Sequence, residues 1–138
     1  MFKQKLILED LVERPVQKLV VIEPQPSLLE IYLRLLQQAN FNAVGARNVD
    51  GLQAALRNQP THLIILNIAL FEKSRQAADF INLLSRDYPS VPVVLMARHE
   101  HTAALPELMS GTVVSHLDQR FSRPGDLVLV AKAVLEGV

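Results

Sequence analysis

The chain has 138 residues, of which 49% are hydrophobic and 20% are charged, a composition typical of one folded domain with a substantial core. Lysine plus arginine and aspartate plus glutamate balance at 14 each, so no strong positive field is available to bind nucleic acid or an anionic membrane. The absence of cysteine excludes disulfides, thiol chemistry and zinc–thiolate sites. Because the sequence also lacks a signal-peptide core and an apolar run of about 18 residues, we expect a soluble cytoplasmic protein.

Residues 1–17 form an N-terminal extension that precedes the domain expected over residues 18–138. Leu6, Ile7, Leu11 and Val12 are spaced as one face of a short helix that ends before Pro15. This extension is either a tail packed on the domain or a contact element for a partner or a second copy.

Five short apolar runs have the length and composition of strands buried in a parallel sheet. They are Leu19–Ile22, Asn42–Ala46, Leu63–Leu66, Val91–Met96 and Thr112–Leu117. Helical patterns separate the runs, which predicts βαβ units with right-handed crossovers. Since open α/β sheets place their chemistry at the carboxyl ends of the strands, Asn67, directly after the third run, is a candidate site residue.

The segments between the runs carry helix signals. Ser27 and Glu30 have capping-box spacing and predict a first helix that extends to about Asn40. Its expected apolar face is Leu28, Ile31, Tyr32, Leu35, Leu36 and Ala39. Asp50 is expected to cap the second helix and Ser122 the last one. The third and fourth helices are expected at about residues 75–86 and 105–109, so the chain predicts a (βα)5 domain of the α/β class.

Together these segments resemble the receiver domain of response regulators in two-component signalling. The resemblance covers roughly residues 18–137 and depends on the order and spacing of its pieces. These are Leu19–Glu30, His62–Asn67, Val91–Ala97, Gly111 before the fifth strand and Ser122–Leu127. It implies a flavodoxin-like topology, a doubly wound parallel sheet of five strands.

The resemblance also implies a set of site positions at the C-terminal edge of the sheet. In receivers, two adjacent acids after the first strand and an acceptor aspartate after the third strand hold Mg²⁺. A threonine or serine after the fourth strand and a lysine after the fifth bind the phosphoryl oxygens. An aromatic residue on the fifth strand often changes rotamer when the site is occupied.

Little of this set is present in the chain. The corresponding positions are Glu23, Pro24, Asn67, Ala97, Ser115 and Asp118, with Gln119 in place of Asp118 if the loop is shifted by one residue. An amide at position 67 has no nucleophilic oxygen comparable to that of a carboxylate. An isolated Asp→Asn artefact would explain Asn67 alone but not the losses at the other positions. We therefore expect a pseudo-receiver that keeps the fold without phosphoryl transfer.

Two alternatives stay open. In the first, a displaced acid would accept the phosphoryl group; the candidates are Glu23, Glu72 and Asp118. In the second, a small ligand would be sensed at the vacated edge site, where Ala97 and Ser115 leave room.

Basic and histidine residues follow the fourth and fifth strands. They are Arg98, His99, His101, Arg120 and Arg123, and they either hold an anion or an acidic partner loop or form a solvated loop face. His99 and His101 have no third ligand at a suitable spacing, so no metal is expected. Phosphate-binding glycine loops and a Gly-x-Ser-x-Gly motif are also missing, so we expect neither a cofactor nor an enzyme.

The expected function is therefore signal transduction through protein–protein contacts in a bacterial two-component or phosphorelay pathway. The expected partner is a signalling kinase or an output protein, and a homodimer is a further candidate. Contacts are expected on the last two helices and the fifth strand, as the resemblance implies, with no direct binding to nucleic acid or membrane.

Overall fold

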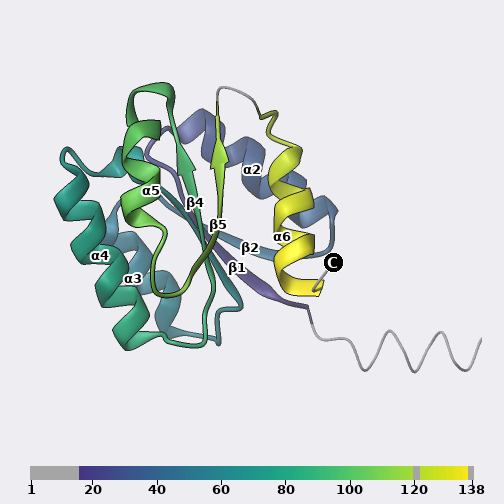
Figure 1. Cartoon of the computed structure of the whole chain (residues 1–138). Helices are drawn as coiled ribbons and strands as arrows, with labels where there is room; N and C mark the ends of the chain where they lie inside the picture. Colours follow the sequence, from purple (N-terminus) through teal and green to yellow (C-terminus); the bar gives the residue numbers. More distant parts are fainter. Residues whose placement is uncertain (1–15, 120–121, 137–138) are drawn as a thin grey trace, which may run out of the picture.

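Figure 1 shows a computed structural model of the chain, which describes residues 16–119 and 122–136. The helix expected within the N-terminal extension lies outside the described residues. The division at residue 17 therefore stays a prediction.

Five parallel strands form the centre of the molecule. They are β1 (Lys18–Ile22), β2 (Asn42–Ala46), β3 (Leu63–Asn67), β4 (Val93–Ala97) and β5 (Val113–Asp118). Their order across the sheet is β2-β1-β3-β4-β5, which confirms the predicted doubly wound topology. The fourth strand begins only at Val93 because Pro92 has no N–H for the ladder.

Helices cover both faces of the sheet (Figure 1). One face carries α2 (Pro26–Gln38) and α6 (Asp126–Glu136). The other carries α3 (Val49–Arg57), α4 (Ser74–Asp87) and α5 (Leu105–Leu108). Two short 3₁₀ helices, η1 (Ile68–Leu70) and η2 (His99–Ala104), follow β3 and β4. Alternate residues of each buried strand contact the two helix layers, since side chains alternate between the faces of a sheet.

Three predicted helix starts are wrong. Helix α2 begins at Pro26, which suits the first helical turn, so Ser27 lies inside the helix instead of capping it. Asn48 caps α3 by accepting a hydrogen bond from the Gly51 amide at 2.8 Å, and Asp50 lies in the first turn. Helix α6 begins at Asp126, while the Ser122 hydroxyl donates to the Asp118 carbonyl at 2.6 Å.

The predicted apolar face of α2 is largely confirmed, with Ile31 as the exception. Leu29, Tyr32 and Leu36 are the buried residues of this helix, whereas Ile31 is exposed. Leu29, Tyr32 and Leu36 are three and four residues apart and share one face, whereas Ile31 is two residues from Leu29 and points away from it. Met109 likewise lies outside α5, as its C-cap residue.

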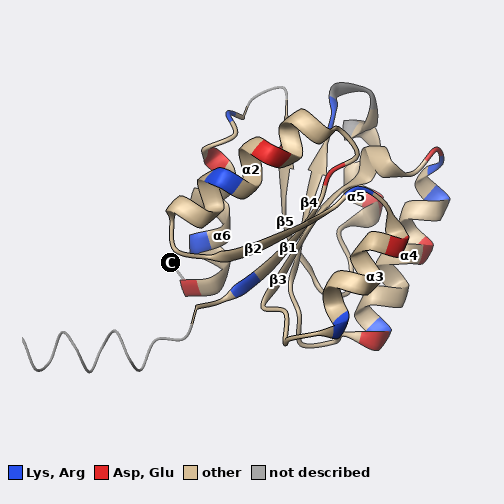
Figure 2. Cartoon of the chain, turned by 180° about the vertical axis from the view of Figure 1, so that it is seen from behind, with Lys and Arg blue, Asp and Glu red and all other residues tan. Residues whose placement is uncertain are grey.

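Acidic and basic residues are interspersed over the visible helices (Figure 2), in keeping with their equal numbers in the chain. Within the described residues, no helix has the length and apolar character that crossing a membrane would require.

One basic side chain is buried at the amino-terminal edge of the sheet. Lys18 Nζ donates hydrogen bonds to the carbonyl oxygens of Ala55 and Gln59, which lie at the end of α3. A cation at a helix C-terminus satisfies carbonyl groups that have no partner within the helix. Lys18 therefore has a structural role, far from the polar residues at the opposite edge.

Candidate functional site

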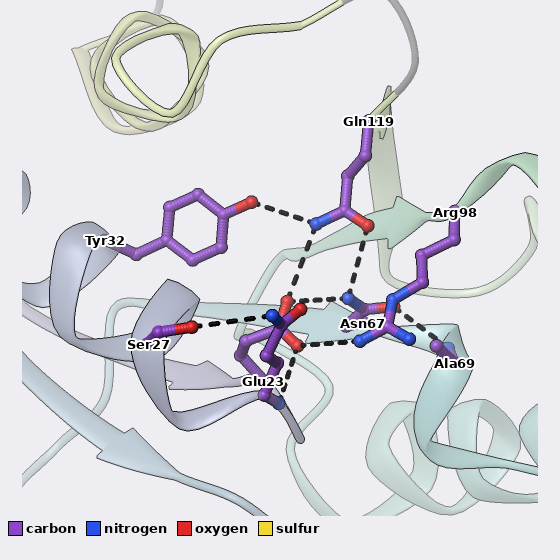
Figure 3. A network of polar contacts seen from close by, with 8 residues as sticks. Glu23, Ser27, Tyr32, Asn67, Ala69, Arg98 and Gln119 are labelled. Atoms are coloured by element: carbon purple, nitrogen blue, oxygen red, sulfur yellow. Dashed lines mark hydrogen bonds and ion pairs between the residues drawn. The ribbon is translucent and has the colours of Figure 1, made fainter.

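Two fully buried polar side chains meet at the C-terminal edge of the sheet. Glu23 directly follows β1, and Asn67 is the last residue of β3. The two strands are neighbours with Ile22 opposite Leu66, so their polar ends are brought together. Asn67 Nδ2 donates a hydrogen bond of 2.7 Å to Glu23 Oε1 (Figure 3).

The other end of the Asn67 amide is occupied as well. Its Oδ1 accepts a hydrogen bond of 2.9 Å from the Ala69 amide, which makes Asn67 the cap of η1. The amide thus links β1 to the segment after β3 and has no group that could act as a nucleophile.

Glu23 is a buried carboxylate with partners on both oxygens. Oε2 accepts from the Gln25 amide at 3.0 Å and lies 3.7 Å from Arg98 Nη2, whose side chain is 36% exposed. A buried charge is tolerated when it is both hydrogen-bonded and paired with an opposite charge. Arg98, one of the basic residues expected after the fourth strand, therefore provides the counterion of Glu23.

Gln119 completes this set of contacts. Its Nε2 donates to the Tyr32 hydroxyl at 2.9 Å and lies 3.5 Å from Glu23 Oε1, while its Oε1 is 3.5 Å from Asn67 Nδ2. We call Glu23, Tyr32, Asn67, Arg98 and Gln119 the edge network. Glu23, Asn67, Arg98 and Gln119 come from the ends of β1, β3, β4 and β5, and Tyr32 comes from α2. Figure 3 shows that these side chains converge.

Burial raises the pKa of Tyr32 above its ordinary value of 10.0, and the nearby Glu23 charge raises it further. The hydrogen bond from Gln119 and the charge of Arg98 act in the opposite direction and do not cancel the rise. The hydroxyl therefore keeps its proton through the neutral range and stays a hydrogen-bond donor.

Comparisons with known proteins agree on the fold. No protein-family model matches the chain. The curated nitrogen assimilation regulatory protein NtrX of Azorhizobium caulinodans is 20% identical over 116 residues, which cover 84% of this chain. The chain spans only 26% of the length of that protein.

Two solved structures extend the comparison. A CheY-like receiver domain protein of Methanospirillum hungatei superposes with a TM-score of 0.76 at 11% identity, over 89% of this chain and 96% of that one. A protein from a family of redox sensors in the streptococci, described as evolved from two-component response regulators, superposes with a TM-score of 0.74 at 22% identity. The match covers 88% of this chain and 52% of that one.

The chain has the fold of a response-regulator receiver domain. This confirms the resemblance on which the site positions depend. The edge network lies at the C-terminal edge of the sheet, where the sequence analysis expected the site, and it includes Glu23 and Asn67 of the expected positions.

One expected site position needs correction within the receiver fold. Gln119 is the residue that contacts Glu23 and Asn67, whereas Asp118 is the half-buried last residue of β5. The alternation along the strand explains the difference. Leu117 packs on the α2 and α6 side, and Gln119 returns to that side while its amide pairs with the Ala97 carbonyl.

The other expected positions lie outside the edge network. Ala97 is fully buried in the core beneath α3, α4 and α5, and Pro24 is partly buried. Ser115 is partly buried opposite Val94. A shift of one residue, as for Gln119, moves the aromatic position from Ser115 to His116, which is exposed.

Sequence reasoning missed the part that Tyr32 takes in the site. Its helical spacing predicted that it lies on the apolar face of the helix, which is correct for its ring. The spacing did not predict that its hydroxyl contacts Gln119. The described residues contain no group of three His, Asp or Glu side chains arranged to bind a metal ion.

Proposed function

We propose that the chain is a signalling module that uses the receiver fold for protein–protein contacts and does not accept a phosphoryl group. The observation that supports this most directly is the Asn67 amide, which replaces a carboxylate and is hydrogen-bonded at both ends. The neighbouring Glu23 is fully buried with both oxygens occupied. The expected setting is a two-component or phosphorelay pathway in the bacterial cytoplasm.

The streptococcal redox sensors, described as evolved from response regulators, provide a precedent for a receiver-derived protein with a different task. Glu72 and Asp118 remain the other acids that the displaced-acceptor alternative needs. Glu72 is exposed, and Asp118 ends β5. The acid that contacts Asn67 is Glu23, which is itself buried and hydrogen-bonded, so the alternative has less support.

The test is a two-dimensional amide NMR spectrum recorded during titration with Mg²⁺ and then with beryllofluoride, an acyl-phosphate mimic. We expect no saturable shifts at Glu23, Asn67 or Gln119, because the site lacks the acceptor carboxylate and most of the metal ligands. A receiver with a complete acid set serves as the positive control. Saturable shifts near Asn67, or a phosphoryl group found by mass spectrometry on Glu23, Glu72 or Asp118 after treatment with acetyl phosphate, would contradict the proposal.

The face that we propose for protein contacts consists of β5 and α6. β5 is an edge strand, and α6 lies beside it (Figure 1). Val114 on β5 is 53% exposed and Leu129 on α6 is 65% exposed. Exposed apolar residues on adjacent elements indicate an interaction surface more strongly than scattered ones do, and an edge strand adds unpaired backbone groups.

We propose a second copy of this chain as the first partner for this face. Light scattering is expected to detect a dimer at high protein concentration that Val114→Asp or Leu129→Asp dissociates, because each change buries a charge in the interface. Ile31→Asp, at an exposed apolar residue on α2, is the matched control. A monomer at every concentration would contradict the dimer while leaving the absence of phosphoryl transfer untouched.

A further inference from the structure

A cavity of about 280 Å³ adjoins the edge network on the side of α2 and α6. Leu28, Leu117 and Pro124 form its apolar walls, and Tyr32, Arg98 and Arg123 contribute polar groups. Neither Ala97 nor Ser115 lines it, so it is not the vacated site expected from the sequence. The cavity therefore needs an explanation of its own.

The charge of the cavity is one-sided. Arg98 and Arg123 both line it, and no acidic side chain does so among the described residues. Arg98 has one charged partner there, Glu23 at 3.7 Å, a distance too long for a direct hydrogen bond. The Arg123 backbone amide donates to Asp126 Oδ2 at 2.8 Å, while the residue is exposed and lines the cavity. Both guanidinium groups thus have donors available for an anion.

Tyr32 is an independent indication of a ligand. The residue is 95% buried, with 5% of its surface exposed, and its hydroxyl oxygen accepts from Gln119 Nε2 at 2.9 Å. Tyr32 lines the cavity, and among the described residues its hydroxyl takes part in one hydrogen bond, as the acceptor from Gln119. A buried donor without an acceptor is costly, and an anion in the cavity would supply the acceptor.

We propose that this cavity binds a small organic acid, with its carboxylate held by Arg98, Arg123 and the Tyr32 hydroxyl. Its hydrocarbon part packs against Leu28, Leu117 and Pro124. Two guanidinium groups suit the planar, bidentate geometry of a carboxylate. The volume lies near the lower end of known ligand pockets, which favours a single ring or a short chain over a nucleotide.

Ligand binding is coupled to the edge network through Arg98. The same guanidinium group serves as counterion to Glu23 and faces the cavity, so the ligand carboxylate and Glu23 share it. The Gln25 amide donates to the same Glu23 oxygen at 3.0 Å. Its NMR shift is therefore expected to change when Arg98 moves from Glu23 toward the ligand. The proposal is independent of the absence of phosphoryl transfer, and its failure would leave that function standing.

The experiment is an amide NMR titration of the whole chain with benzoate. We expect saturable shifts at millimolar concentration for Leu117, Gln119 and Gln25. Arg123→Gln, an exposed position, is expected to weaken binding about tenfold through loss of a charged hydrogen bond. Tyr32→Phe, which keeps the ring, is expected to weaken it about fivefold. Arg75→Gln, the same change at an exposed residue of α4, is the control and is expected to leave binding unchanged.

Three further probes define the chemistry of the ligand. Benzyl alcohol tests whether the ligand must be charged, and inorganic phosphate tests whether it must have an apolar part. A peptide that ends in a phenylalanine with a free carboxylate tests whether the C-terminus of a protein is the natural ligand. We expect all three to bind more weakly than benzoate. The proposal is overturned if benzoate gives no saturable shift, if Arg123→Gln and Tyr32→Phe bind like Arg75→Gln, or if any of the three probes binds better.

Discussion

Replacing Asn67 with aspartate is expected to lower the free energy of unfolding by about 3 kcal/mol at pH 7 and not to restore a phosphorylation site. The change converts a 2.7 Å hydrogen bond between Asn67 Nδ2 and Glu23 Oε1 into a contact between two carboxylate oxygens. Both residues are fully buried, so water screens their repulsion poorly. Arg98 offsets part of this repulsion but is already paired with Glu23.

The loss of stability in Asn67→Asp is expected to depend on pH in a defined direction. Repulsion raises the pKa of one carboxyl group of the pair in the folded protein, so the two groups share a proton. A folded state that binds more protons than the unfolded state becomes more stable as pH falls. The deficit relative to the wild type is therefore expected to be smaller at pH 5 than at pH 7.

Urea unfolding followed by circular dichroism measures this effect at the two pH values, with an unchanged denaturant slope as the check on two-state behaviour. Asn82→Asp, at an exposed position in the middle of α4, is the matched control and is expected to change the free energy of unfolding by less than about 0.5 kcal/mol. An Asn67→Asp protein as stable as this control would contradict the edge network. So would complete recovery of its stability by millimolar Mg²⁺, since that would mean that a working metal site had survived.

The strands were predictable because each has an apolar run that is buried on both faces. Such runs are short and continuous, and turn-forming residues bound them in the sequence. The helix starts were less predictable because several side chains compete for the same cap. Asn48 and Asp50 both offer a carboxyl or amide oxygen, and only the path of the chain from β2 determines that Asn48 reaches the free amide of Gly51.

The candidate site was predictable as a place but not as a set of contacts. The order of the strands brings residues 23 and 67 to the same edge, which the sequence pattern implied. The choice between Asp118 and Gln119 depended on one residue of register in β5, where the pairing with β4 is irregular near Val93 and Val94. A shift of one residue moves a side chain to the other face of a sheet. The contact from Tyr32 to Gln119 joins residues 87 positions apart, and no local pattern encodes it.

Removing the Glu23 side chain is expected to have the second large effect. In Glu23→Ala, the buried Asn67 amide loses its acceptor, which costs about 1–3 kcal/mol. The N–H of the exposed residue Gln25 loses its acceptor as well, at a smaller cost because water can reach it. Gln119 Oε1, at 3.5 Å from Asn67 Nδ2, recovers part of this cost, and the partly exposed Arg98 turns to water. We expect the free energy of unfolding to fall by about 2–3 kcal/mol.

Two matched variants separate the causes of this loss. Glu23→Gln keeps one acceptor oxygen and is expected to lose roughly half as much stability. Glu30→Ala removes an exposed carboxylate whose salt bridge with Arg34 joins one helical turn of α2, and it is expected to cost less than about 0.5 kcal/mol. If Glu23→Ala were no more costly than Glu30→Ala, Glu23 would not hold the edge together, and its carboxylate would again be a reasonable phosphoryl acceptor. A large loss, partly recovered in Glu23→Gln, would mean that this acid is retained for its hydrogen bonds, which is the state expected of a receiver fold that has given up phosphoryl transfer.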